Sequence, residues 1–244
     1  NSRVSNIEQI NEQYRVTTTD GKIYECKYIL SSMPLAHLPK TVESVEDKNV
    51  IKSGESLKFR DFLTVALVVE ETYSFPDNWI YIHDPDVRVG RVQNYGSWSP
   101  YLVKDGKTCL GLEYFVNIND EMWNMEDKDL IEFGTNELTS LNLIKKDSVL
   151  EGYVFRMPKA YPTYDLDYQK NVSCISDWLK KDHPHIFPIG RNGMHKYNNQ
   201  DHSMMTAVMS IRNIFGENND IWKINVEEDY HEEVSTGRAS PTIN

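Results

Sequence analysis

The residues best suited to chemistry lie between Gly190 and Met204, where glycines, cations and polar side chains follow one another closely. A short apolar stretch precedes them, a loop opens with Gly190-Arg191-Asn192-Gly193, and a helix is expected to begin with Asp201 as its N-cap. A strand, a glycine loop and a helix N-terminus present free backbone N–H groups and a positive dipole end to an anion. The pattern therefore predicts an anion site, although the same arrangement is also common as a purely structural connection.

Cationic side chains elsewhere give weaker candidates for a substrate site. Arg91, followed by the aromatic run Tyr95–Tyr101, could grip a phosphate or a carboxylate, and Arg156 near Tyr161 could do the same. For each of these residues an ordinary surface charge is the alternative interpretation.

Motifs of several other enzyme classes are absent from the sequence. It has no Gly-x-Ser-x-Gly, no phosphate-binding Walker loop and no His-Glu-x-x-His, so hydrolase, nucleoside triphosphatase and zincin functions have no support. His183 and His185 are close together, but no carboxylate or cysteine lies at a suitable spacing from them. We therefore expect no metal site.

Composition and charge limit the partners. The 244 residues carry 26 basic and 37 acidic side chains, and the formal net charge of −11 argues against nucleic-acid binding. No apolar run approaches the roughly 20 residues that a membrane-spanning helix needs, so no span is expected. The three cysteines lie far apart, which is typical of reduced thiols in a cytoplasmic protein and not of a disulfide scaffold.

Hydrophobic patterning predicts a chain that is rich in strands and has three main helices. The expected strands are residues 4–10, 14–18, 23–28, 28–32, 59–70, 79–83, 108–118, 148–156 and 185–189. The expected helices are residues 127–141, 165–181 and 201–215, and the last of these is expected to bury a stripe of Met204, Val208, Ile211 and Phe215.

These elements divide the chain into four parts. Residues 1–40 form an antiparallel meander and a returning strand, and residues 41–157 form a β-rich domain with one helix. Residues 158–226 form a helix, strand, loop and helix, and residues 227–244 form an acidic, polar tail.

The run from Gly190 to Asp201 resembles the C-terminal flavin-binding signature of the UDP-galactopyranose mutases. That signature reads glycine, arginine, any residue, glycine, and then an aromatic-basic-tyrosine run that ends at a helix-opening aspartate. Tyr161-Pro162 resembles the Tyr-Pro that the family places upstream. The order of a meander, a strand ending at Ser32-Met33-Pro34, a β-rich domain and a final strand and helix is similar to the wider group of amine oxidase-like FAD enzymes, which includes protoporphyrinogen oxidase.

The resemblance implies a mixed α/β fold, in which a partial FAD/NAD(P)-binding domain carries an inserted antiparallel-sheet substrate domain. It implies FAD as the cofactor, with NAD(P)H as a candidate reductant. The implied cofactor-binding residues are Pro34, Gly190, Arg191, Gly193, Asp201, His202, Ser203 and Met204. The candidate substrate-binding residues are Arg91, Arg156, Tyr161, His195 and Tyr197, and no catalytic residue is identified.

Two features limit what the resemblance implies. The family's Gly-x-Gly-x-x-Gly motif, which cradles the FAD pyrophosphate, is absent, and no Met precedes Asn1. We therefore expect the C-terminal half of an FAD-dependent oxidoreductase, inactive by itself and partnered by a missing N-terminal half. His195 and Lys196 depart from the mutase pattern. A mutase-like isomerase of sugar nucleotides in polysaccharide biosynthesis and a non-catalytic binding module remain the alternatives.

Overall fold

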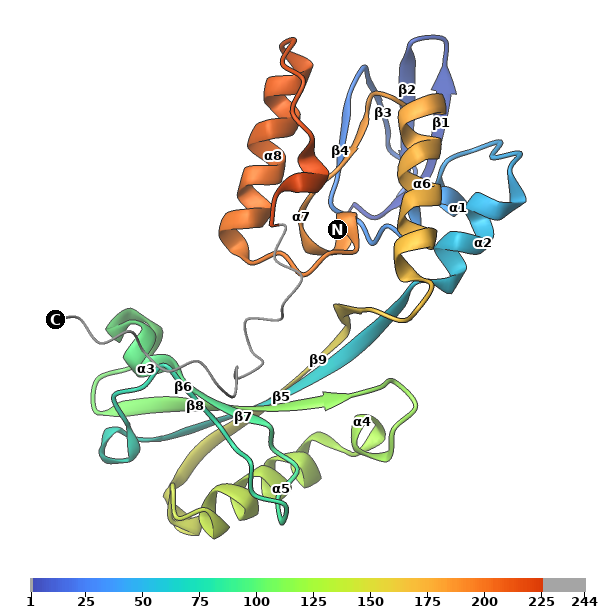
Figure 1. Ribbon diagram of the computed structural model, residues 1–244. Helices are drawn as coiled ribbons and strands as arrows, with labels where there is room; N and C mark the ends of the chain where they lie inside the picture. The colour runs from blue at the N-terminus through green and yellow to red at the C-terminus, as the bar shows by residue number, and fades with distance from the viewer. Residues whose placement is uncertain (1, 226–244) are drawn as a thin grey trace, which may run out of the picture. The chain divides into compact units, whose positions relative to one another are not determined.

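The computed structural model describes residues 2–225, which fold into two compact units of mixed α/β structure, as expected (Figure 1). Unit 1 combines residues 2–56 with residues 168–225, and unit 2 is Leu57–Asp167. The expected boundaries after residues 40 and 157 differ from this division. Helix α2 (Lys48–Ser56) packs against helix α6 (Tyr168–Asp182), and strand β9 (Val149–Thr163) continues past residue 157. The expected tail lies outside the described residues.

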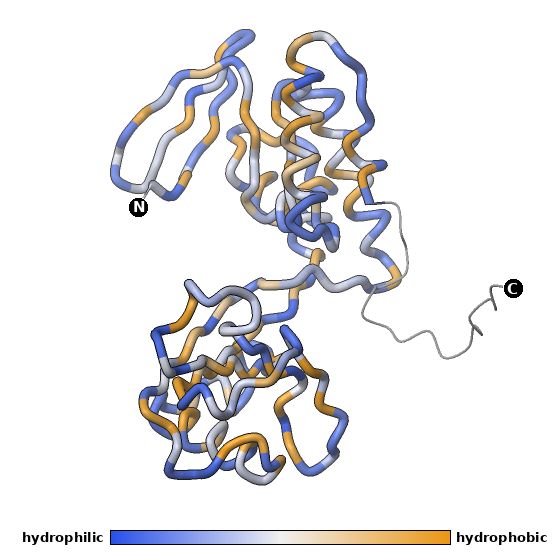
Figure 2. Tube along the Cα trace, turned by 90° about the vertical axis from the view of Figure 1, so that its left-hand side faces the viewer, coloured by the Kyte–Doolittle hydropathy of each residue, from blue (hydrophilic) through white to orange (hydrophobic). Residues whose placement is uncertain are grey.

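A three-stranded antiparallel meander opens unit 1, as the sequence predicts. The strands β1 (Val4–Ile10), β2 (Gln13–Thr18) and β3 (Ile23–Cys26) pair in chain order. Figure 2 shows hydrophobic residues interspersed with hydrophilic ones along these strands. Ile7 and Tyr14 are buried, so one face of the meander packs into the unit.

Two short strands from distant parts of the sequence form a parallel pair in unit 1. Strand β4 (Ile29–Ser31), the returning strand, pairs with β10 (Ile186–Pro188), and this pairing joins the two segments of the unit. The remaining helices of unit 1 are α1 (Leu38–Thr41), α7 (Gly190–Met194), α8 (Gln200–Ile214) and the 3-10 helix η4 (Ile221–Lys223). No helix among the described residues has the length and apolar character that crossing a membrane requires.

Three expectations for the C-terminal segment are wrong. Residues 190–193, expected as a loop, begin the short helix α7, and the N-cap of α8 is Asn199 instead of Asp201. The expected core stripe of α8 also faces outward, since its four residues are between 42% and 86% exposed. Thr206 and Ser210 are buried in its place. Periodicity detects an apolar stripe, but here the side with small hydroxyl residues packs into the unit.

Unit 2 is a five-stranded antiparallel sheet in the order β6-β7-β8-β5-β9. Besides β9, its strands are β5 (Lys58–Glu70), β6 (Trp79–Tyr81), β7 (Arg91–Asn94) and β8 (Lys107–Val116). Its helices are α3 (Tyr95–Trp98), α4 (Glu121–Asn124) and α5 (Asp127–Ser140), with the 3-10 helices η1 (Glu71–Tyr73), η2 (Pro100–Leu102) and η3 (Lys146–Ser148).

The core of unit 2 lies where α5 packs on one face of this sheet. Val65 of β5 and Leu112 of β8 point to that face, and Leu130 and Leu138 of α5 are fully buried with them. A Cβ atom at Gly134 would lie 3.0 Å from the Leu112 side chain, so a glycine lets the helix approach the sheet closely. Alternate strand residues therefore face the helix, and the others form the opposite face of the sheet.

A buried histidine lies among the aromatic side chains of unit 1. The His183 ring is 9% exposed, and its centroid lies 4.8 Å from that of Trp178 and 6.2 Å from that of Tyr14. Within residues 2–225 its Nδ1 has no hydrogen-bond partner. Burial holds the pKa of His183 below its ordinary value, because the charged ring would lose its hydration there.

We expect this histidine to make the chain sensitive to acid. The unfolded chain binds the proton near the ordinary histidine pKa of about 6.5, whereas the native chain binds it only at lower pH. The free energy of unfolding should therefore fall as the pH drops below about 6.5, by about 1.4 kcal/mol for each unit between the two pKa values. Urea unfolding at pH 7.5, 6.5 and 5.5 measures this loss.

His183→Phe should reduce the loss between pH 7.5 and 5.5, because it keeps a ring in the packing and removes the proton site. His185→Phe, on the other side of Pro184, is the matched control and should keep the wild-type dependence. Parallel curves for wild type and His183→Phe would contradict the prediction.

Candidate functional site

The end of strand β4 and helix α7 are in backbone contact. The N–H of Leu35 donates to the carbonyl of Asn192 at 2.9 Å, and the N–H of Ile189 donates to the carbonyl of Ser31 at 2.9 Å. A Cβ atom at Gly193 would lie only 2.5 Å from the Ser31 carbonyl oxygen. The second glycine of the predicted signature is therefore required by backbone packing inside unit 1.

The first glycine of the signature connects α7 to α8. Gly190 has a φ of +74°, a conformation that favours glycine, and its N–H donates to the Thr206 hydroxyl at 2.9 Å. Its carbonyl accepts a 3.4 Å hydrogen bond from Nδ2 of Asn198. The structure thus brings the two glycines, the end of β4 and α8 into one cluster.

The cationic residues of the segment are engaged within unit 1. The Arg191 guanidinium lies 4.4 Å from the centre of the Tyr197 ring, and its Nε donates to the Asn198 carbonyl at 3.0 Å. Nζ of Lys196 donates to the carbonyls of Trp222 and Ile224 at 2.9 and 2.8 Å. Burial lowers the pKa of Lys196.

His195, a predicted substrate-binding residue, is only 1% exposed and caps the C-terminus of α7 with a φ of +48°. A residue that ends a helix in the left-handed conformation is usually glycine or asparagine. The position of His195 is therefore that of a packed, turn-forming side chain.

The N-terminus of α8 is closed by a capping box. The side chain of Asn199 accepts from the backbone N–H of His202, and Nδ1 of His202 accepts from the Asn199 N–H at 3.3 Å. The Asp201 carboxyl group is exposed and lies 3.7 Å from Nδ1 of His202. Ser203 is partly buried close to Gly190, and Met204 is 64% exposed. Of the predicted cofactor residues on α8, Ser203 is the one that reaches the glycine cluster.

A pocket of about 520 Å³ opens beside Pro34, the remaining predicted cofactor residue. Its lining residues combine cationic, hydroxyl and apolar side chains: Arg3, Val4, Ser32, Met33, Pro34, His37, Lys40 and Thr41. Nζ of Lys40 also contacts Glu55 at 2.7 Å, in an exposed ion pair of small energetic value. No sequence signal identifies Arg3 or Lys40 as pocket residues, because nothing in their spacing relates them to Pro34.

Besides Nδ1 of His183, the buried polar atoms of unit 1 without a hydrogen-bond partner within residues 2–225 include Oγ of Ser31, at the end of β4, and Oδ1 of Asn198, ahead of the α8 N-terminus. A buried polar atom without a partner is costly unless a ligand or water satisfies it. Neither residue lines the pocket beside Pro34, whose mixed cationic and apolar lining by itself fits one end of a dinucleotide cofactor. The sequence has no glycine motif to cradle its pyrophosphate, so the fit covers only part of FAD.

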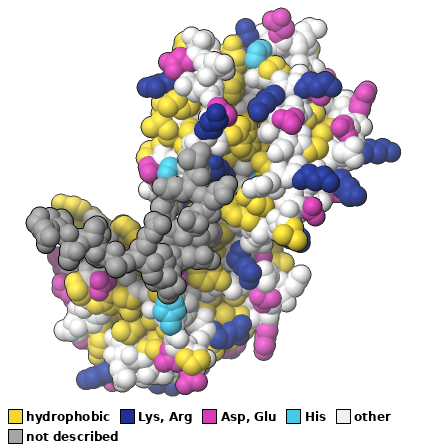
Figure 3. Space-filling view, viewed as in Figure 1, with side chains coloured by type: hydrophobic (Ala, Val, Ile, Leu, Met, Phe, Trp, Pro, Cys, Tyr) yellow, Lys and Arg dark blue, Asp and Glu magenta, His cyan; other side chains and the backbone are white. Residues whose placement is uncertain are grey.

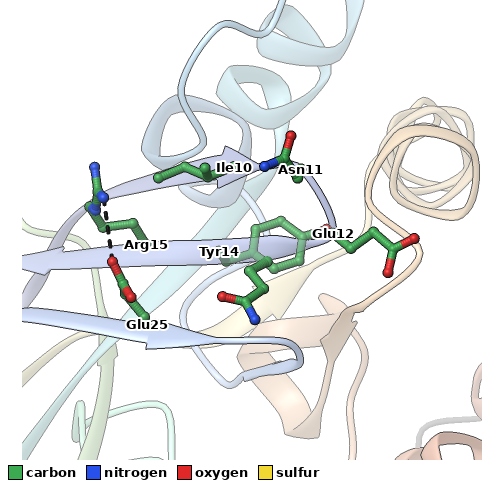
Figure 4. Close-up of a pocket in the computed structure, with 7 residues that line it drawn as sticks. Ile10, Asn11, Glu12, Tyr14, Arg15 and Glu25 are labelled. Carbon is green, nitrogen blue, oxygen red and sulfur yellow. Dashed lines mark hydrogen bonds and ion pairs between the residues drawn. The ribbon is translucent and has the colours of Figure 1, made fainter.

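A second pocket of about 470 Å³ opens at the β1–β2 turn and is lined by Ile10, Asn11, Glu12, Gln13, Tyr14, Arg15 and Glu25 (Figure 4). The Arg15 guanidinium contacts Glu8 and Glu25 at 3.2 and 3.3 Å. Since its cation is already paired with two carboxylates, we assign no ligand to this pocket.

The face of the unit 2 sheet opposite α5 carries Arg91 and many aromatic side chains. Arg91 is buried and donates from Nε to the Glu113 carboxylate, which also accepts from Gln93. The Arg91 guanidinium lies 5.7 Å from the centre of the Tyr81 ring. Arg91, which the sequence predicts to bind substrate, is therefore engaged in an ion pair with a residue 22 positions away.

The other two predicted residues of unit 2 lie on different faces. Arg156 is on the α5 side, where it donates to the carbonyls of Trp123 and Met125 and pairs with Asp127 at 2.6 Å. Tyr161 packs edge-on against Phe62 on the opposite side, with ring centroids 5.6 Å apart. Arg156 thus secures the start of α5 and does not join Arg91 or Tyr161. Within residues 2–225, no group of three or more His, Cys, Asp or Glu side chains is placed to hold a metal ion.

The fold is similar to that of several solved structures, although sequence identity is low. No protein-family model and no curated protein matches the sequence. Reduced UDP-galactopyranose mutase is 18% identical with a TM-score of 0.77, over 92% of this chain and 49% of that one. A protein of Exiguobacterium sp. 255-15 assigned as a protoporphyrinogen oxidase is 13% identical with a TM-score of 0.63, over 86% and 47%. A protein of Pyrococcus furiosus is 15% identical with a TM-score of 0.54, over 91% and 48%.

These likenesses confirm at the level of the fold the resemblance to UDP-galactopyranose mutase and protoporphyrinogen oxidase-type flavoproteins. This chain spans about half the length of the solved structures that it matches.

The glycine contacts predict different costs for two alanine substitutions. Gly193→Ala would place a methyl group against the Ser31 backbone, and overpacking of this kind costs about 1–3 kcal/mol. Gly190→Ala meets nothing closer than 3.9 Å and should cost roughly 1 kcal/mol, from its positive φ alone. Urea unfolding followed by far-UV circular dichroism compares them. A larger loss for Gly190→Ala would show that α7 does not pack on β4 as described.

The capping box predicts that Asn199 matters more for stability than Asp201. Asn199→Ala should lower the free energy of unfolding by about 1 kcal/mol, the usual value of a lost N-cap. Asp201→Ala changes an exposed side chain and should cost less than about 0.5 kcal/mol. Thermal melts of the two variants at one pH test this order, and the reverse order would restore Asp201 as the cap.

Proposed function

We propose that this chain is the C-terminal half of an FAD-dependent oxidoreductase, in which unit 1 supplies part of the cofactor site and unit 2 the substrate side. The observation that carries the proposal is the succession of meander, parallel β4–β10 pair, α7 and α8. A chain with this succession aligns over 92% of its length with reduced UDP-galactopyranose mutase at a TM-score of 0.77.

The pocket beside Pro34 is the proposed place for one end of FAD. Arg3 and Lys40 carry charges that suit a phosphate group, while Val4 and Met33 offer apolar contact to a flat base. Contacts of both kinds are what a nucleotide needs for affinity and orientation. The pyrophosphate needs the glycine motif that this sequence lacks, so the chain alone should hold the cofactor poorly.

The N-terminus of α8 is the proposed electrostatic element of the site. When bound, FAD supplies the chemistry of hydride transfer. Negative charge near the start of a helix is favoured by the helix dipole, and Asn199 fixes where this helix starts. The unsatisfied Oδ1 of Asn198 and Oγ of Ser31 lie in the same cluster and would gain partners from a polar ligand.

The open face of the unit 2 sheet is the proposed substrate side. Phe115, Tyr153 and Phe155 are each about half exposed there, on the strands β8 and β9. Aromatic side chains of this kind stack on sugar or base rings, which fits a small-molecule or sugar-nucleotide substrate. The buried Arg91–Glu113 ion pair lies on the same face and adds polarity without a net charge.

A mutase-like isomerase is the second candidate, because the run Gly190–Asp201 and the TM-score of 0.77 both favour it. The two departures from the mutase pattern do not weigh against it, since His195 is buried and Lys196 binds carbonyl groups within unit 1. Net consumption of an electron acceptor would separate the two reactions. NAD(P)H as reductant, a role in polysaccharide biosynthesis and a cytoplasmic location remain predictions.

FAD retention tests the proposal. The 244-residue chain, incubated with FAD and desalted, should show little flavin absorbance, whereas the longer protein that includes the upstream polypeptide should be yellow. In that protein, Arg3→Gln and Lys40→Gln should each weaken FAD binding about tenfold or more, since a charge-assisted hydrogen bond contributes about 1.5–3 kcal/mol.

Lys22→Gln is the matched control, because this lysine of unit 1 pairs with Asp20 at 2.8 Å and does not line the pocket. A colourless longer protein would favour a non-catalytic module. Equal FAD affinity in all three variants would place the cofactor elsewhere.

A further inference from the structure

Arg3, which lines the pocket beside Pro34, is an exposed cation that no carboxylate balances among residues 2–225. Lys40 lines the same pocket, and its side chain is still 55% exposed in the ion pair with Glu55. On the face of unit 1 in Figure 3, by contrast, Lys and Arg side chains are interspersed with Asp and Glu side chains. The pocket therefore has positive charge available for an anionic occupant.

The end of the described chain is fastened to the segment that follows helix α7. Nδ2 of Asn225 donates to the Tyr197 carbonyl at 2.7 Å. Nζ of Lys196 binds two further carbonyls in the segment just before Asn225. Residues 226–244, which lie outside the described residues, therefore start next to α7.

Helix α7 also contacts the segment that forms the pocket. The N–H of Leu35, which follows Pro34, donates to the Asn192 carbonyl of α7 at 2.9 Å. This helix has five residues and is only about 7.5 Å long. Eight extended residues, as many as residues 226–233 contain, span up to about 26 Å. These residues can therefore reach the pocket from Asn225.

The chemistry of residues 226–233, the acidic segment, complements that of the pocket. The segment places five carboxylate groups around the ring of Tyr230. The pocket offers Arg3 and Lys40 to carboxylates and the apolar side chain of Val4 to a ring. A flat ring beside anionic groups is also what a nucleotide presents. The five acidic residues are Glu227, Glu228, Asp229, Glu232 and Glu233.

We propose that the acidic segment occupies the pocket beside Pro34 in the cofactor-free chain, and that the nucleotide end of the cofactor displaces it. A single exposed ion pair contributes little energy. Tethering to unit 1, however, gives the segment an effective concentration in the millimolar range, so several weak contacts together can hold it. The contact itself involves this chain alone, whereas its effect on cofactor binding rests on the proposed function.

Coupling of carboxylates to amines with a carbodiimide tests the contact in the full 244-residue chain. At about 20 mM salt, mass spectrometry of the digested product should find Lys40 joined to the acidic segment, beside the Lys40–Glu55 product that their ion pair predicts. The product with the acidic segment should decrease at least fivefold at about 0.5 M salt, because salt screens exposed charges.

Lys22 is the matched control for the coupling. It is an exposed lysine of the same unit and pairs with Asp20 at 2.8 Å. It should yield the product with Asp20 and none with the acidic segment.

ADP, which carries a base and two phosphate groups, is the probe for displacement. A variant in which the five acidic residues of the segment are replaced by their amides should bind ADP roughly tenfold more tightly than wild type at low salt. The two Kd values, from isothermal titration calorimetry, should converge at high salt. This variant changes no residue of the described fold and should keep the wild-type melting temperature.

The matched control for ADP binding removes five exposed carboxylates from unit 2 in the same way. It should change the Kd less than twofold. The five residues replaced by their amides are Glu121, Glu126, Asp129, Glu132 and Asp147.

Several outcomes would overturn the proposal. They are no Lys40 product with the acidic segment at low salt, a product that salt does not decrease, or coupling only between two copies of the chain. ADP binding that Arg3→Gln weakens but the acidic segment does not affect would support the proposed function and overturn the displacement. A salt-sensitive Lys40 product without ADP binding by either protein would support the contact and count against the proposed function.

Discussion

The parallel pairing of β4 with β10 is the constraint on which the arrangement of this chain depends. It joins a strand near the start of the described sequence to one near its end, so the chain between β4 and β10 must lead back to unit 1. Unit 2 meets this requirement because its first and last strands are neighbours, with Lys58 opposite Thr163. An inserted domain whose ends are paired adds little closure entropy to the unit that contains it.

Local sequence signals predicted most of the main strands and helices correctly. They did not show which side of a helix faces the core or which strands pair. The meander followed from β-branched strands around the Asp20-Gly21 turn, β5 and β8 followed from their content of Val, Ile, Leu and aromatic residues, and α5 followed from its apolar stripe. The outward stripe of α8 did not, because a period of 3.6 residues marks an apolar side without saying what lies against it. Asn199 and Asp201 are both good N-caps by type, so only the backbone could decide between them.

The candidate site shows the same limit for charged residues. The sequence identified Arg91, Arg156 and Arg191 as cations suited to an anionic ligand, but it could not show that each has an acceptor inside its own unit. Their partners lie 22, 29 and 7 residues away, and no local rule relates such positions. The sequence predicted the two glycines as cofactor contacts. In the structure, Gly193 is required because a side chain there would collide with the backbone of Ser31.

The polar inner side of α8 explains how the helix can leave its apolar side open. Thr206 and Ser210 donate to carbonyls of their own helix at 2.7 and 2.8 Å, so their burial leaves no hydroxyl proton unsatisfied. Small side chains also let the helix come close enough for Thr206 to accept from Gly190. The helix is therefore held by short polar contacts, and its larger apolar residues remain available. In an ordinary amphipathic helix the apolar residues pack against the rest of the fold, so α8 differs from such a helix in packing through its small hydroxyl residues.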